Sequence, residues 1–393
     1  MTTSIIITLC ILILLAYLFD ISSAKTRIPA VILLLLLGWV LKQLTVFFAV
    51  PLPELSSLLP LLGTVGLILI VLEGSLELEL NKSKLPLVKK AAVVSFFPLL
   101  ASALILAWLF SYFGGYSYKQ ALVNMLPFAI ISSAIAIPSA RNLNGYNREF
   151  VTYESSLSDI IGVIIFNFVM LNAVIDATAF MHFGWQLLLI LVVSFLATVG
   201  LSYLLGRIQH HIKFIPIMVM VILIYIVSKH YHLPSLLFIL LFGIFLGNLD
   251  ELKRYKWIAK LNPDDLNKEV HKFKEIATEA AFVIRTFFFL VFGYLIETNE
   301  LLNTDTLLWA GIVVVVIFTI RAIQLKIAKL PLFPLLFIAP RGLISILLFL
   351  SISPTDKIGI VNNSLIIQVI ILTALIMMGG MMGVKKIKDE IPA

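Results

Sequence analysis

The sequence predicts an all-α polytopic membrane protein with about thirteen transmembrane helices, and two observations support this fold class. Hydrophobic residues make up 61% of the 393 residues and charged residues 13%, whereas soluble domains contain about half and about a quarter. Apolar windows also recur along the whole chain with short polar connections between them, and one span needs about 20 residues. We therefore expect a single membrane domain over residues 1–393, without a sizeable soluble domain.

Thirteen apolar windows define the expected spans. In chain order they are Ser4 to Phe19, Ile28 to Phe48, Leu58 to Leu76, Leu87 to Phe113, Ala121 to Leu143, Tyr153 to Ile175, Trp185 to Leu205, Ile212 to Val227, Pro234 to Gly247, Ala277 to Ile296, Leu307 to Ile327, Pro331 to Ser351 and Leu365 to Val384. The first window has no basic segment before it and no small-residue cleavage pattern after it, so it is a span rather than a signal peptide.

Composition also limits the partners. The single cysteine, Cys10, lies in the first span, so we expect neither a disulfide framework nor a cysteine-based cofactor or metal site. The net charge of +7 is dispersed over membrane connections and is therefore not the footprint of a nucleic-acid-binding protein. The expected surroundings are the lipid bilayer, and no cofactor is expected.

The basic residues predict the orientation. Of the 29 Lys and Arg residues, 22 fall in the odd-numbered connections or the C-terminal tail, and only four fall in the even connections: Lys42, Lys119, Lys229 and Lys357. By the positive-inside rule the N-terminus lies outside and the C-terminus in the cytoplasm, as an odd number of spans requires. We expect an integral protein of a bacterial inner membrane.

The third and sixth spans carry acids inside apolar sequence. Glu73 lies within GLILIVLEGSLELEL, and the sixth span begins YESSLSDIIGVIIFN, with Glu154 and Asp159. On a helix Ser155 and Asp159 share one face, and Glu154 and Ser158 share the adjacent one. An ionisable group within a span costs at least about 2.5 kcal/mol, so it indicates function. The alternative is a polar helix start whose carboxylates lie in interfacial water.

The fifth and twelfth spans predict broken helices. Pro138 lies inside the fifth span, near Ser132 and Ser133, and the twelfth contains Pro340, Arg341 and Gly342 in mid-segment. Proline removes a backbone donor and breaks or kinks a helix, and matching interruptions in two inverted halves indicate a transporter binding site. The offset of seven spans predicts inverted six-helix repeats at about 4–176 and 212–384, joined by the span at 185–205. Two ordinary proline kinks are the alternative.

The longest connection separates the ninth and tenth spans. Its basic residues, interleaved with Trp257, Ile258, Leu261 and Phe273, suit an amphipathic helix on the cytoplasmic leaflet. A solvated, charged loop is the alternative.

Three acids and three bases lie within the spans, which is the balance expected if most are paired in the protein interior. The acids are Glu73, Glu154 and Asp159, and the bases are Arg285, Arg321 and Arg341.

The motifs around these charges resemble the monovalent cation:proton antiporter superfamily, particularly the NhaP and sodium/proton exchanger branch, over nearly the whole chain. The similar segments are ESSLSD with Glu154, Ser155 and Asp159, LEGSLELEL with Glu73, IFTIRAIQL with Arg321, and APRGLIS with Arg341. The resemblance implies an NhaA/NhaP-like fold with crossed broken helices and a homodimer. It also implies a core domain from spans 4–6 and 11–13, a dimerisation domain from the remaining spans, and a structural Glu154–Arg321 ion pair.

Three positions depart from that pattern. Ala136, Ile137 and Pro138 stand in place of the branch's Thr-Asp-Pro, Ser158 replaces an amide, and Arg285 stands where the branch often has an acid. Ser158 retains an oxygen lone pair and can donate to Asp159.

These residues predict a secondary antiporter that exchanges sodium, or lithium or potassium, for a proton by competition at Asp159, and the resemblance implies elevator-type alternating access. The expected cation ligands are Asp159, Ser155, Ser158, Glu73 and the backbone carbonyls of Ala136 and Ile137. A single titrating acid favours electroneutral one-for-one exchange. The rival functions are a potassium channel or efflux pathway and a non-transporting sensor, whereas no catalytic motif indicates an enzyme.

Overall fold

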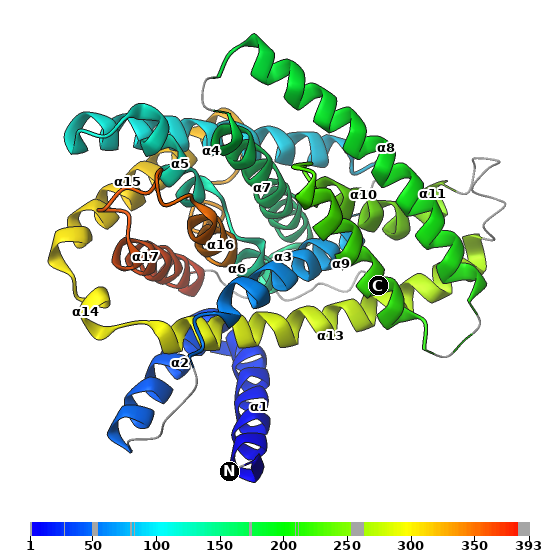
Figure 1. Cartoon of the computed structure of the whole chain (residues 1–393), viewed down its shortest axis with the longest axis horizontal. Helices are drawn as coiled ribbons and strands as arrows, with labels where there is room; N and C mark the ends of the chain where they lie inside the picture. Colours follow the sequence, from blue (N-terminus) through cyan, green and yellow to red (C-terminus); the bar gives the residue numbers. More distant parts are fainter. Residues whose placement is uncertain are drawn as a thin grey trace.

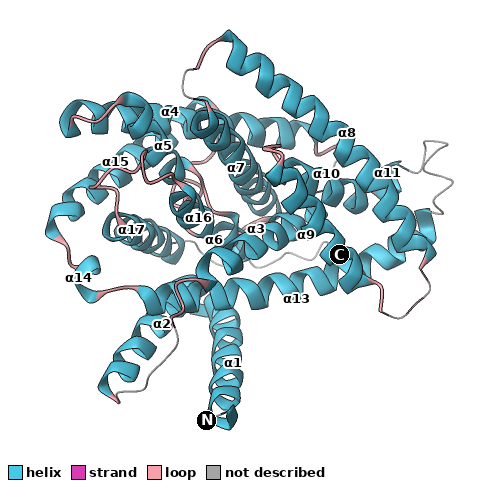
Figure 2. Ribbon diagram, viewed as in Figure 1, coloured by secondary structure: helices cyan, strands magenta, loops and turns pink. Residues whose placement is uncertain are grey.

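The computed structural model describes residues 2–26, 28–48, 54–78, 81, 83–172, 175–208, 210, 212–252 and 263–383 (Figure 1). Within these residues every regular element is a helix, and Figure 2 draws no strand. Nine of the described helices are long and apolar enough to cross a membrane, and three shorter apolar helices accompany them. The all-α polytopic membrane fold is therefore confirmed, while the count of thirteen spans and the internal repeats remain predictions.

The described helices follow the expected order of spans. Their bounds are α1 Thr2–Thr26, α2 Ala30–Phe47, α3 Leu58–Glu77, α4 Leu85–Gly114, α5 Tyr118–Ala129, α6 Ser133–Ser139, α7 Gly145–Leu171, α8 Ala177–Arg207, α9 Phe214–His230, α10 Leu236–Gly247, α13 Pro263–Leu295, α15 Thr304–Ile327, α16 Leu343–Ser351 and α17 Asn363–Met382. The short elements are η1 Ala140–Asn142, α11 Leu249–Leu252 and α14 Thr298–Leu301.

Helix α7 begins eight residues before the expected start at Tyr153. Asn144 caps it, because its side-chain oxygen accepts the Asn147 N–H at 2.8 Å and satisfies a donor that the first turn leaves free. Glu154 therefore lies more than two turns inside the helix with 1% of its surface exposed. The alternative of a polar helix start with carboxylates in interfacial water is wrong for Glu154 and Asp159, since both are buried.

Helix α13 begins at Pro263, fourteen residues before the expected start at Ala277. The segment 263–276, which we expected on the leaflet surface or in a solvated loop, continues into the span. Phe273 is fully buried, together with Leu266 and Val270, because these side chains form one apolar face of the helix that packs into the protein. Trp257, Ile258 and Leu261 of the same prediction lie outside the described residues.

The fifth span breaks at residues 130–132 rather than at Pro138. Helix α5 ends at Ala129, and α6 continues from Ser133 through Pro138. The Ile131 N–H donates to Ser158 Oγ at 3.0 Å, and the Ser132 N–H donates to the Pro340 carbonyl at 2.9 Å. The backbone N–H groups at the break thus find acceptors in other segments. Tertiary contacts, rather than a proline, therefore set the position of the break.

The predicted carbonyls of Ala136 and Ile137 are consequently not released by a break. Both lie inside α6, and both accept from the Ala140 N–H that ends the helix. The twelfth span is interrupted where we expected it, because residues 331–342 form turns and extended segments and α16 begins directly after Gly342. The contact between Ser132 and Pro340 joins the two interruptions.

The helices pack in two groups that meet mainly through α3. One group, here called the α13 group, contains α1, α2, α3, α8, α9, α10 and α13; the other, the α7 group, contains α4, α5, α6, α7, α15, α16 and α17. Figure 1 shows α13 crossing below α7 and α16, with α15 and α17 to one side. Helix α3 contacts α6, α7 and α16, and α10 also contacts α7, so these helices form the boundary between the groups.

Close helix crossings within the α13 group depend on glycine. A Cβ atom added at Gly38 of α2 would overlap the Leu290 carbonyl of α13, and one added at Gly293 would overlap the Leu35 carbonyl of α2. Small residues of this kind allow membrane helices to approach backbone to backbone.

We predict that Gly38→Ala lowers the thermal stability of the purified protein by about 1 to 3 kcal/mol, because the methyl group must push α2 away from α13. Gly200→Ala in α8 is the matched control, since nothing lies within 4 Å of its added Cβ. Thermal unfolding in detergent measures both variants. Equal melting temperatures for wild type and Gly38→Ala would contradict the close crossing.

Candidate functional site

Asp159 lies in the middle of α7 beside the break between α5 and α6. Only 1% of its surface is exposed, and its Oδ2 atom accepts hydrogen bonds from the Ser133 N–H, at 3.2 Å, and from the Ser133 hydroxyl. Its Oδ1 atom is buried and has no hydrogen-bond partner among the described residues. Leaving a buried acceptor unsatisfied is costly, so this atom is the natural position for a proton or a cation.

The serines around Asp159 have different contacts. Ser158 Oγ accepts the Ile131 N–H at 3.0 Å and thereby holds the break against α7, whereas Ser155 Oγ donates to the Val151 carbonyl of its own helix at 2.8 Å. The hydroxyl groups of Ser132 and Ser156 are buried without a partner among the described residues. The structure therefore brings Ser158 and Asp159 to the break, and it adds the unpartnered hydroxyl oxygens of Ser132 and Ser156, which the sequence did not predict as cation ligands.

Glu154 and Arg321 form a buried, bidentate ion pair between α7 and α15. The two N–O distances are 2.7 and 3.0 Å, and the exposed fractions of the two side chains are 1% and 4%. The Arg321 Nε atom also donates to the Leu335 carbonyl at 2.8 Å. The pair thus connects α7, α15 and the turns that precede α16, with its hydrogen-bonding capacity well satisfied.

Arg341 covers the C-terminal end of α5. Its Nε atom donates to the Phe128 carbonyl and its Nη2 atom to the Ala129 carbonyl at 3.4 Å, while Ser345 Oγ donates to the Pro127 carbonyl at 2.7 Å. The last carbonyls of a helix have no partner within it and carry partial negative charge. A buried cation on the opposite broken segment satisfies them here.

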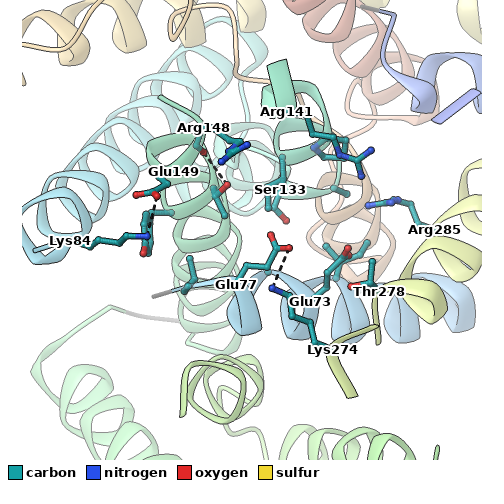
Figure 3. A pocket seen from close by; sticks show the side chains of 18 residues that line it. Glu73, Glu77, Lys84, Ser133, Arg141, Arg148, Glu149, Lys274, Thr278 and Arg285 are labelled. Carbon is teal, nitrogen blue, oxygen red and sulfur yellow. Dashed lines mark hydrogen bonds and ion pairs between the residues drawn. The ribbon is translucent and has the colours of Figure 1, made fainter. Parts of the chain in front are cut away.

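Glu73 and Arg285 lie apart from this cluster, on α3 and α13, and both line a cavity of about 410 Å³. Figure 3 shows the two side chains with Ser133, whose hydroxyl binds Asp159, in the same cavity. Both side chains are half-buried. We call this space the charged cavity, because further charged residues of α3, η1, α7 and α13, and Lys84 just before α4, also line it.

A second cavity of about 450 Å³ lies further along α7, toward its C-terminal end. Thr152 and Tyr153 of α7 line the charged cavity, and Val163 and Asn167 line the second one. Asp159 falls between these two sets of residues. Helix α3 shows the same separation, with residues 70–77 at the charged cavity and residues 60–67 at the other, so the carboxylate lies between two cavities.

Ser133 is the residue that sequence reasoning missed. It belongs to the polar run Ser132-Ser133, but the proline rule assigned the break to Pro138, five residues later. The available signal was the pair of hydroxyl residues at the start of a short apolar helix, a position that serine favours. Here neither hydroxyl caps the helix, because Ser132 Oγ has no partner among the described residues and the Ser133 hydroxyl donates to Asp159.

The chain is similar to known sodium/proton antiporters. A family model described as "Sodium/hydrogen exchanger, transmembrane" matches residues 10–384. Two structures of the sodium proton antiporter MjNhaP1 from Methanocaldococcus jannaschii also match, one of them determined at pH 8 with a TM-score of 0.72 and 19% sequence identity, covering 96% of this chain and 99% of that one. The other, an electron microscopy map, has a TM-score of 0.69 and 18% identity, covering 96% and 94%. None of the curated proteins that were compared matches the sequence.

We predict that Arg321→Gln destabilises the protein by about 3 to 5 kcal/mol, because Glu154 is then left as a buried, uncompensated charge. The double variant Glu154→Gln with Arg321→Gln should recover much of the loss, since two neutral side chains replace the pair. Thermal unfolding in detergent measures each variant. If the double variant loses as much free energy of unfolding as the two single variants together, the ion pair is not what holds these segments together.

Proposed function

Because the chain belongs to the transmembrane sodium/hydrogen exchanger family, we propose that it exchanges sodium for protons by competition at Asp159. The observation that carries this proposal is the unpartnered, buried Oδ1 atom of Asp159 between two cavities. A carboxylate holds either a proton or a cation, and the occupied site can open to one side at a time. Binding of a cation at Asp159 therefore requires release of its proton, and binding of a proton requires release of the cation.

The cation site is proposed at the break between α5 and α6. Sodium is a hard cation that takes oxygen ligands, and about five or six are needed when it loses most of its water. Asp159 Oδ1 supplies the charge, and the hydroxyl oxygens of Ser158, Ser155 and the unpartnered Ser132 are the neighbouring candidates. Water from the charged cavity completes the set. Lithium and potassium take the same ligand types, so both belong in the test.

Elevator-type movement is proposed for the α7 group against the α13 group. Asp159, Ser133, the Glu154–Arg321 pair and Arg341 all belong to the α7 group, whereas Glu73 and Arg285 belong to the α13 group. The hydrogen bonds that hold the carboxylate thus lie within one packing group and can move with it. In the α7 group, Arg321 and Arg341 are proposed to keep the broken segments rigid during that movement.

Glu73 and Arg285 are proposed to act at the boundary. Both residues line the charged cavity, Glu73 from α3 and Arg285 from α13. An arginine stays protonated, so Arg285 is proposed to favour the charged form of Glu73 and to leave Asp159 as the single group that exchanges its proton. Exchange is then one cation for one proton and moves no net charge. We further propose a homodimer in a bacterial inner membrane, with the N-terminus outside, from the family resemblance and the distribution of basic residues.

We predict that Asp159→Asn abolishes cation-dependent proton flux, because an amide neither releases a proton nor offers the charge that replaces a cation's water. Sealed vesicles with an imposed pH gradient, to which sodium, lithium or potassium is added, measure the flux. Wild type should dissipate the gradient with at least one cation, and the variant should remain at the level of protein-free vesicles.

Asp305→Asn is the matched control, since Asp305 is exposed in the first turn of α15. It should exchange like wild type. A wild-type protein without any cation-dependent proton flux would contradict exchange and would favour a channel or a sensor, and an active Asp159→Asn variant would remove Asp159 from the mechanism.

Voltage tests the stoichiometry separately. With the membrane potential clamped at two values, one-for-one exchange should proceed at the same rate, since the cycle carries no net charge. A rate that changes with voltage would mean that a second group, Glu73 first among them, takes part in the cycle.

A further inference from the structure

The charged cavity has an unexpected balance of charge for a route that a cation is proposed to take. Among the described residues, five basic and three acidic side chains line it. The basic residues are Lys84, Arg141, Arg148, Lys274 and Arg285, and the acidic ones are Glu73, Glu77 and Glu149. The lining therefore carries an excess of two positive charges, which repels cations and attracts anions.

Ion pairs account for part of this lining. Lys84 contacts Glu149 at 3.0 Å, and Lys274 contacts Glu77 at 3.7 Å. Arg141 forms an ion pair with Asp20 of α1, with 3.1 Å between Arg141 Nη1 and Asp20 Oδ2.

Two guanidinium groups and one carboxylate, that of Glu73, are left without an ion pair among the described lining residues. Neither Arg148 nor Arg285 forms an ion pair within 4 Å with any acid of the described chain. Arg285 and Glu73 line the same cavity without forming an ion pair.

The guanidinium groups converge from two sides. Arg141 and Arg148 belong to η1 and α7, in the α7 group, and Arg285 belongs to α13. In Figure 3 the ends of Arg141 and Arg285 point toward one another, while Arg148 lies on the other side of Ser133, next to Glu149.

Like charges that face each other repel. Asp20, which pairs with Arg141 and lines a small neighbouring cavity together with Arg285, offsets only part of this positive charge. The cavity of about 410 Å³ has room for an anion and its water.

We propose that the charged cavity binds a phosphate group between Arg141, Arg148 and Arg285. Guanidinium groups are planar forks that bind phosphate oxygens in pairs, and three of them can surround one phosphate from different directions. The phosphate can belong to a soluble anion or to the headgroup of an anionic lipid, because the recognising chemistry is the same.

The bound phosphate inhibits exchange, an effect that rests on the proposed function. It bridges the α7 group, through Arg141 and Arg148, to the α13 group, through Arg285. A ligand that contacts both groups in only one of their arrangements favours that arrangement. The bridged protein is therefore held with the charged cavity open, and the step that carries Asp159 to the other side slows.

Binding is tested first without transport. Inorganic phosphate, as its choline salt, is titrated into the purified full-length protein in detergent by calorimetry, for wild type, Arg148→Gln and Arg148→Lys. Wild type should bind about one phosphate per chain. Arg148→Gln should weaken binding about five- to tenfold, since a charge-assisted pair of hydrogen bonds is lost, and Arg148→Lys should lie between the two. Arg207→Gln, exposed at the end of α8 and remote from the lining, should bind like wild type.

Inhibition is tested in vesicles with choline phosphate on both sides of the membrane, against choline chloride at equal ionic strength. Phosphate should slow wild-type exchange severalfold, and Arg148→Gln should need about five- to tenfold more phosphate for the same effect. A second set of vesicles without soluble phosphate compares phosphatidic acid with phosphatidylcholine. Inhibition by phosphatidic acid that Arg148→Gln relieves identifies a lipid headgroup as the source.

Several outcomes would overturn the proposal. Absence of saturable phosphate binding, or equal affinity in wild type and Arg148→Gln, removes the site. An equal effect of chloride means general screening of surface charge. Intact exchange that neither phosphate source slows removes the inhibitory role. Loss of all cation-dependent proton flux in wild type instead contradicts the proposed function, and the calorimetry still decides the binding site in that case.

Discussion

The structure depends on holding the Asp159 carboxylate beside the break between helices α5 and α6. Within a bilayer, backbone donors and acceptors must be satisfied by protein, so a helix can be broken only if other segments take over its hydrogen bonds. Here Ser158 and Pro340 accept the N–H groups of the first break, and Arg341 and Ser345 donate to the carbonyls at its other end. Asp159 binds Ser133 at the same place, so breaking the helix and holding the carboxylate are one arrangement.

The buried charged residues of the α7 group have different binding partners. Glu154 and Arg321 bind one another through two hydrogen bonds, and removing either partner would leave an uncompensated buried charge. Arg341 donates its hydrogen bonds to backbone carbonyl groups. Neither Arg321 nor Arg341 therefore neutralises Asp159. Asp159 is therefore the buried acid of the α7 group without an ion pair among the described residues, which leaves its unpartnered oxygen open to a proton or to a cation.

The other acid, Glu73, lies across the boundary with Arg285 on the α13 group. On the proposed movement of the α7 group, charges that stay with the α13 group act on the carboxylate in one of its two positions and not in the other. The charged cavity is thus proposed to influence loading and release without contributing to the carboxylate's own hydrogen bonds. An anion bound by the arginines of that cavity, as proposed above, would change the same electrostatic balance.

The sequence by itself determined the membrane fold, the order of the spans and the family, because hydropathy and local motifs need no knowledge of neighbouring segments. It also identified Glu154, Asp159, Arg321 and Arg341, since charge within an apolar span is conspicuous. Only the tertiary structure decided where α5 breaks, that Ser133 binds Asp159, and that α13 extends to Pro263. A proline marks a weak point of a helix, but the break forms where distant segments accept the backbone's hydrogen bonds, and that depends on which helices meet.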